Sequence, residues 1–153
     1  MSIKDIVTET KIMNGLTAKD VDEIISISQE ETFKKGDSIF EEDATGKNLY
    51  IVLEGSVKVE IQNYSFHIYR GEKRHLTTLG RGEVFGEITF LGGGRRTAGI
   101  TSIDNVRLMN IDGVKLYELF RKNYHMGYLM MRNISSILAK RLSEINFKYR
   151  DNR

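Results

Sequence analysis

The chain has 153 residues, of which 40% are hydrophobic and 29% are charged, the size and balance of one globular domain with its own core. It contains no cysteine, which excludes disulfide scaffolds, thiolate catalysis, zinc–thiolate sites and iron–sulfur clusters. The net charge is only +2, with both signs interleaved along the chain, so no block of charge predicts direct binding to DNA. No apolar run approaches the ~20 residues of a membrane span, and Met1–Lys11 shows no secretory signal, so we expect a cytoplasmic protein without a membrane contact.

The first predicted element is a short helix over residues 17–29. Thr17 followed by Asp20 is a variant of the capping box that starts many helices. The helical spacing of the apolar residues that follow predicts one buried face. That face consists of Val21, Ile24 and Ile25.

Strand patterns come next and fill the middle of the chain. Apolar and polar residues alternate with a period of two, or form short buried runs, between glycine-containing turns. Two of these turns, Gly36–Asp37 and Glu54–Gly55, are predicted to close hairpins. The predicted strands are residues 32–35, 38–41, 48–54, 56–62, 66–69, 76–79, 98–103 and 106–111.

Helical periodicity returns at Val114 and continues to Tyr149. The layout is therefore a mainly β protein with flanking helices: a roll over residues 30–111, preceded by a short helix and followed by C-terminal helices over 112–150. Short, closely spaced strands with glycine turns favour a jelly-roll-like β-roll over a parallel sheet. We expect one domain over residues 1–153.

One glycine-rich segment, residues 80–98, carries the chemistry. Gly86 permits close backbone approach, and residues 87–91 have the length of one helical turn whose free N–H groups suit an anion. Arg96 can pair with that anion, and Glu87 can accept a hydrogen bond from a neighbouring hydroxyl. An anion beside a hydroxyl describes a phosphorylated sugar. The spacing leaves a second interpretation open, an internal ion pair between Glu87 and Arg96.

The sequence lacks the motifs of dinucleotide-binding, metal-binding and catalytic sites. The Gly80-x-Gly82 spacing has no third glycine and no βαβ unit around it, so it is no dinucleotide-binding fingerprint. His67, His75 and His125 form no metal-ligand spacing, and no nucleophile–base arrangement can be built. We therefore predict no catalytic residue, no metal, no cofactor and no enzyme.

Three segments resemble the cyclic nucleotide-binding domains of catabolite activator proteins, cyclic-AMP-dependent kinase regulatory subunits and cyclic-nucleotide-gated channels. Residues 85–90 followed by 96–98 resemble the phosphate-binding cassette of that family. Residues 33–40 resemble its first hairpin, and residues 49–59 resemble its central hairpin. The likeness extends over residues 12–147. It implies the family's β-roll and a sensor that binds a cyclic nucleotide, cyclic AMP more than cyclic GMP.

The resemblance also implies a role for each matched residue. Glu87 would bind the ribose 2′-hydroxyl, and Arg96 would bind the cyclic phosphate with help from the Thr97 hydroxyl. A threonine at this position is also associated with acceptance of cyclic GMP in some relatives. Arg95 has no matching role. Backbone contacts to the sugar and phosphate would come from Gly86, Ile88, Thr89, Thr97 and Ala98.

The long C-terminal helix is expected to form a homodimer and to close the ligand site. Its apolar residues are too many for one face, which indicates a partner helix. In the family match, Ile145 and Asn146 fall where related bacterial sensors contact the purine, although a solvated Asn146 is equally compatible with the pattern. The two stripes are Met131, Ile134, Leu138, Leu142, Ile145 and Tyr149, with Met130 and Ile137 to one side.

The sequence names no downstream protein. Family transcription factors continue into a helix-turn-helix domain, for which we expect no room before Arg153. Two alternatives stay open. The chain can be a protein-interaction module on the same fold with another effector or none, or the sensor fragment of a transcription regulator.

Overall fold

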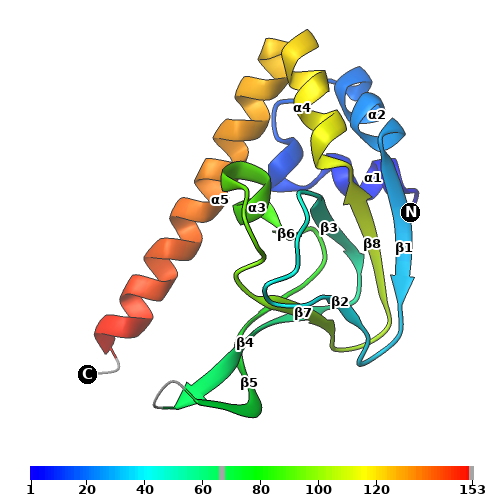
Figure 1. Ribbon diagram of the computed structural model, residues 1–153. Helices are drawn as coiled ribbons and strands as arrows, with labels where there is room; N and C mark the ends of the chain where they lie inside the picture. The colour runs from blue at the N-terminus through cyan, green and yellow to red at the C-terminus, as the bar shows by residue number, and fades with distance from the viewer. Residues whose placement is uncertain (66–67, 152–153) are drawn as a thin grey trace.

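The computed structural model describes residues 1–65 and 68–151 and confirms the predicted β-roll, with eight strands in two antiparallel sheets. One sheet has the order β1-β8-β3-β6 and the other the order β2-β7-β4-β5. The helices gather on one side of the first sheet, and the β4–β5 hairpin projects from the opposite end of the roll (Figure 1). The strands are β1 (Ser28–Phe33), β2 (Ser38–Phe40), β3 (Leu49–Glu54), β4 (Val57–Ser65), β5 (Ile68–Leu79), β6 (Val84–Phe85), β7 (Gly99–Ser102) and β8 (Val106–Ile111).

The helices flank the roll at both ends of the chain. The capping box at Thr17 is formed, because the Asp20 amide donates to the Thr17 hydroxyl and the Thr17 amide donates to the Asp20 carboxylate. Two short N-terminal helices precede it that the sequence pattern did not predict. The helices are α1 (Ile3–Thr8), the 3-10 turn η1 (Lys11–Met13), α2 (Ala18–Ser26), α3 (Glu87–Gly92), α4 (Gly113–Lys122) and α5 (Tyr124–Asp151).

Strand β3 lies at the centre of the molecule and is buried on both faces. Leu49, Ile51 and Leu53 pack against the helices, whereas Val52 packs into the layer between the two sheets. Because successive side chains of a strand point to opposite faces, a strand between two apolar layers needs a continuous apolar run. This arrangement explains why residues 49–53 do not alternate with polar ones.

The prediction that the Gly36–Asp37 and Glu54–Gly55 turns close hairpins is wrong. The Gly36–Asp37 turn connects β1, which pairs with β8, to β2, which pairs with β7. Likewise, β3 pairs with β6 and β8, whereas β4 pairs with β5 and β7. At each turn the chain passes from one sheet to the other. Strands that are adjacent in sequence therefore become neighbours across the roll and do not share a ladder.

The region after β4 also differs from the prediction. A single long strand, β5, replaces the two predicted strands at 66–69 and 76–79, and it forms a true hairpin with β4. The start of the predicted 66–69 strand lies outside the described residues. The two-residue strand β6 is an addition; it pairs with β3 and leads directly into α3.

The N-terminal half of α5 is anchored to the roll. Asn123 accepts a bond from the Met126 amide, which caps α5, and donates to Asp20 at 3.1 Å. Asn133 is buried and donates to the carbonyls of Ile12 and Asn14 at 2.8 and 2.9 Å. Beyond this anchor the helix continues past α3 (Figure 1). Among the described residues, no helix combines the length and apolar character that crossing a bilayer demands.

Candidate functional site

Gly86 sets the geometry at the start of α3. Its φ of 85° lies in the left-handed region, and a Cβ there would come within 2.7 Å of the Asn48 carbonyl oxygen. The glycine therefore lets the chain turn sharply out of β6 against the start of β3. This turn places Glu87 in the first turn of α3, where it is 7% exposed.

Arg96 enters the site from the loop between α3 and β7. Its main chain is held by the preceding β2–β3 loop, since its amide donates to the Ala44 carbonyl and its carbonyl accepts from the Asp43 amide, both at 2.8 Å. Arg95, by contrast, points outward and donates to the Asp43 carbonyl at 2.9 Å. The sequence gives two adjacent arginines, and the backbone pairing decides which of them is buried.

Arg96 is 4% exposed, and its guanidinium is held by neutral oxygens. Nη1 donates to the Gly86 carbonyl at 3.1 Å and to the Thr89 hydroxyl, and Nη2 donates to the Asn48 carbonyl at 3.1 Å. The group also lies 4.3 Å from the centre of the Phe40 ring, a cation–π distance. These contacts fix the plane of the guanidinium.

One donor of Arg96 lacks an acceptor. Its Nε is buried and makes no hydrogen bond within the described part of the chain. Burial is the main influence on this group and lowers the pKa of Arg96 from its ordinary value. A buried, charged donor without an acceptor is costly, and an anionic oxygen is the acceptor that relieves it best.

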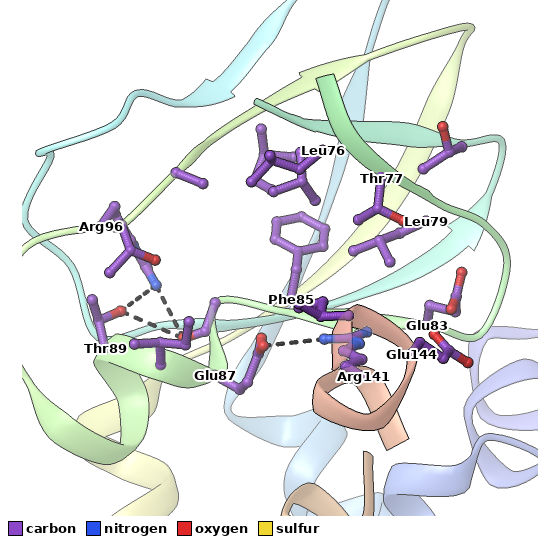
Figure 2. A pocket seen from close by; sticks show the side chains of 18 of the residues that line it. Leu76, Thr77, Leu79, Glu83, Phe85, Glu87, Thr89, Arg96, Arg141 and Glu144 are labelled. Atoms are coloured by element: carbon purple, nitrogen blue, oxygen red, sulfur yellow. Dashed lines mark hydrogen bonds and ion pairs between the residues drawn. The ribbon is translucent and has the colours of Figure 1, made fainter. Parts of the chain in front are cut away.

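Glu87 does not form the ion pair with Arg96 that the spacing left open. Its Oε1 instead accepts from Nη1 of Arg141, on α5, at 3.1 Å. Nη2 of Arg141 donates to the Val84 carbonyl at 2.6 Å. Figure 2 shows Glu87 and Arg141 pointing toward each other, with Arg96 and Thr89 on the other side of the site. The contact joins α5 to β6 and α3.

A cavity of about 1000 Å³ opens beside these residues. Arg96 and Glu87 line it from the α3 side, β5 forms another wall, and α5 closes it with Arg141 and the turns that follow. Its volume is at the upper end of the range usual for small-molecule sites. Much of the remaining lining is apolar and suits a flat ring system: Phe40, Val59, Leu76, Phe85, Ile100 and Ile145.

The described residues do not gather three potential metal ligands of the histidine, cysteine or carboxylate type. The groups that converge on the cavity are instead a cation, a carboxylate and an apolar wall. This combination matches a ligand with an anion, a hydroxyl and an aromatic ring.

Residues 30–123 match the family model of the cyclic nucleotide-binding domain, which covers more than half of the chain. The chain belongs to this family. The Cyclic AMP receptor protein of Thermus thermophilus is 30% identical over 141 residues, covering 90% of this chain and 59% of that protein. This cyclic nucleotide-binding domain thus spans little more than half the length of that relative.

Solved structures give the same relationship. The Thermus thermophilus Catabolite Activator Protein superimposes on this cyclic nucleotide-binding domain with a TM-score of 0.76 and 28% identity, covering 92% of this chain and 62% of the other. The regulatory domain of Toxoplasma gondii PKA, crystallised with cAMP, has a TM-score of 0.66 and 25% identity, covering 75% and 42%.

The structure of this cyclic nucleotide-binding domain brings most of the predicted site residues to one cavity. The seven residues of the predicted cassette that line it are Gly86, Glu87, Ile88, Thr89, Arg96, Thr97 and Ala98. Asn146 is not among the residues that line the cavity, and its contact with a purine stays a prediction. Its neighbour Ile145 does line it, because one step along a helix rotates the side chain by about 100°.

Sequence reasoning missed several residues of this cyclic nucleotide-binding domain. Arg141 was not among the predicted site residues, yet it pairs with Glu87. A signal existed, since Arg141, Ile145 and Lys148 fall on one helical face with steps of four and three. No sequence signal indicated that Phe40, from β2, stacks on Arg96.

Proposed function

We propose that this chain is a cyclic-nucleotide sensor that binds cyclic AMP in preference to cyclic GMP. Arg96 binds the cyclic phosphate, Glu87 binds the ribose 2′-hydroxyl, and the base lies against the apolar wall near Phe85 and Ile145. The observation that carries the proposal is the buried Nε of Arg96, which has no acceptor within the described residues although it belongs to a side chain that lines the cavity. A phosphate oxygen supplies that acceptor.

The choice of cyclic AMP rests on two relatives, the Cyclic AMP receptor protein of Thermus thermophilus and the regulatory domain of Toxoplasma gondii PKA crystallised with cAMP. Isothermal titration with each nucleotide in turn, on protein freed of any co-purified ligand, tests it. We expect tighter binding of cyclic AMP. Tighter binding of cyclic GMP would reverse the preference, and no heat with either nucleotide at millimolar concentration would overturn the proposed function.

Removing the 2′-hydroxyl from the ligand is expected to weaken binding. Arg141 donates a hydrogen bond to Oε1 of Glu87. The second carboxylate oxygen, Oε2, then accepts a hydrogen bond from the ribose 2′-hydroxyl. A hydrogen bond to a charged group contributes about 1.5–3 kcal/mol, so 2′-deoxy cyclic AMP should bind roughly 10- to 100-fold more weakly than cyclic AMP. Titration of both nucleotides measures the ratio.

Glu87→Gln provides the control. The amide keeps the shape of the side chain but loses the charge, so the two nucleotides should differ far less in this variant. If the preference for the 2′-hydroxyl is the same in both proteins, then another residue binds the ribose. A matched substitution outside the cavity lining, Glu118→Gln at an exposed position of α4, should leave the preference unchanged.

We also propose that α5 pairs with the α5 of a second copy. Beyond the anchor at Asn133, Leu142, Ile145 and Tyr149 are exposed although they repeat with steps of three and four. Such a stripe is typical of a helix that packs against another helix. Light scattering should report a dimer. Leu142→Glu should give a monomer, whereas Ser136→Glu, on a different face of α5, should remain dimeric. A monomeric wild-type protein would contradict the pairing.

A further inference from the structure

Asn48 lies just before β3, outside the cavity lining, yet it holds Arg96. Its main-chain carbonyl accepts from Arg96 Nη2 at 3.1 Å. The other two acceptors of the guanidinium are the Gly86 carbonyl and the Thr89 hydroxyl. All three are neutral oxygens, and no carboxylate of the described residues forms an ion pair with Arg96. The direction of the guanidinium therefore depends on where these oxygens are held.

The side chain of Asn48 fixes its own carbonyl in place. Its Nδ2 donates to Oδ1 of Asn110 on β8 at 2.9 Å, and its Oδ1 accepts from the Gly113 amide at 3.1 Å. Asn110 in turn donates from Nδ2 to Glu31 on β1 at 3.1 Å. This chain of donors and acceptors leaves the Asn48 amide one orientation that satisfies every partner.

The partner on the other side, Gly113, is the first residue of α4. A Cβ at Gly113 would lie 2.1 Å from the Lys47 carbonyl oxygen and 3.3 Å from Phe90 of α3. The start of α4 is thus packed directly on the residue before Asn48. Further along α4, Tyr117 stacks on Phe90 and donates to its carbonyl. Helix α4 therefore contacts both α3 and the segment of residues 47–48 that holds Arg96.

We propose that Asn48 is a positioning residue: it orients Arg96 for the phosphate and transmits a shift of Arg96 to the first turn of α4. This inference rests on the proposed function. The main-chain carbonyl of Asn48 accepts a hydrogen bond from the guanidinium of Arg96. Its side-chain oxygen accepts a hydrogen bond from the main-chain amide of Gly113, the first residue of α4. Because one residue makes both contacts, a displacement of the Arg96 guanidinium also displaces the start of α4.

Two measurements on the full chain test the positioning role. Asn48→Ala keeps the main-chain carbonyl that accepts from Arg96 but removes the two side-chain bonds that hold it in place. We expect cyclic AMP binding to weaken about tenfold, which equals about 1.4 kcal/mol. In hydrogen exchange, the ligand should protect the amides at residues 113–117 in the wild-type protein but not in Asn48→Ala, while amides of α3 are protected in both. The control is Asn105→Ala, which removes a side-chain bond to the Lys35 amide at the far end of β8. It should match the wild type.

A double-mutant cycle separates positioning from general loss of stability. In an Arg96→Lys background, which lacks the planar fork, Asn48→Ala should cost less than about threefold in affinity, because its effect acts through Arg96. A full tenfold loss in that background would assign Asn48 a merely structural role. If Asn48→Ala does not fold, Asn110→Ala removes one brace of the same amide and should weaken binding about threefold.

The outcomes distinguish the inference from the proposed function. If the wild-type protein binds neither cyclic AMP nor cyclic GMP, the proposed function is wrong and the inference fails with it. If the wild type binds while Asn48→Ala and Asn110→Ala bind equally well, the inference alone is wrong. Equal protection of residues 113–117 in the wild type and Asn48→Ala would also overturn it.

Discussion

Replacing Arg96 with alanine is expected to weaken cyclic AMP binding by ~30-fold or more. Removing one partner of a buried charge pair costs about 2–5 kcal/mol, and each 1.4 kcal/mol is a factor of ten in affinity. Arg96 is buried and lines the cavity, so no other side chain of the cassette replaces its charge. Titration calorimetry measures the loss, and the melting temperature shows whether the variant folds.

The neighbouring arginine is the matched control for this prediction. Arg95 carries the same charge one residue away but is exposed and bonded to the Asp43 carbonyl. Arg95→Ala should change the affinity by less than about threefold, as expected for a solvated charge. If both substitutions weaken binding equally, then the assignment of Arg96 to the phosphate is wrong.

The second large effect is expected from Gly86→Ala, which should lower both stability and affinity. A Cβ at this position lies 2.7 Å from the Asn48 carbonyl oxygen and 3.0 Å from Nη1 of Arg96, and the φ of 85° is unfavourable for alanine. The clash must move either the start of β3 or the Arg96 guanidinium. We expect a loss of roughly 2–4 kcal/mol in the free energy of unfolding, which urea unfolding measures.

Gly36 offers a control with the same backbone strain and no clash. Its φ is 88°, and nothing lies within 4 Å of the position of its Cβ. Gly36→Ala should therefore cost only about 1–2 kcal/mol, the left-handed penalty alone, and should leave nucleotide binding intact. If the two substitutions destabilise the protein equally, close packing at Gly86 does not contribute.

The roll could be predicted from the sequence, and the candidate cassette proposed from it, because both are local patterns. The glycine at 86, the acid at 87 and the arginine at 96 lie within one short segment, and the buried run at 49–53 needs only its own composition to be identified as a strand. The partner of a strand is not a local property. Nothing in residues 33–40 indicates that the Gly36–Asp37 turn passes between sheets, so the hairpin prediction was wrong.

The same limit applies to the site. The contact between Arg141 and Glu87 joins residues far apart in the chain, and helical periodicity alone does not tell which stripe of α5 faces the cavity. Asn146 therefore stays a prediction for the purine contact, while its neighbour Ile145 is the residue of this turn that lines the cavity. Cation–π packing of Phe40 on Arg96 depends on the register of β2 against β7, which the sequence does not show.

Helix α5 extends far beyond the residue at which it is anchored to the roll. Its N-terminal half is held at Asn133, which is buried and bonded to Ile12 and Asn14, and its last described residue is Asp151. At 1.5 Å per residue, Arg141 lies about 12 Å from Asn133 and Asp151 about 27 Å. A shift of about 1 Å at the Arg141–Glu87 contact therefore becomes roughly 2 Å at the helix end. The length of α5 beyond Arg141 thus makes any displacement beside Glu87 larger at the helix end, provided that the helix stays rigid.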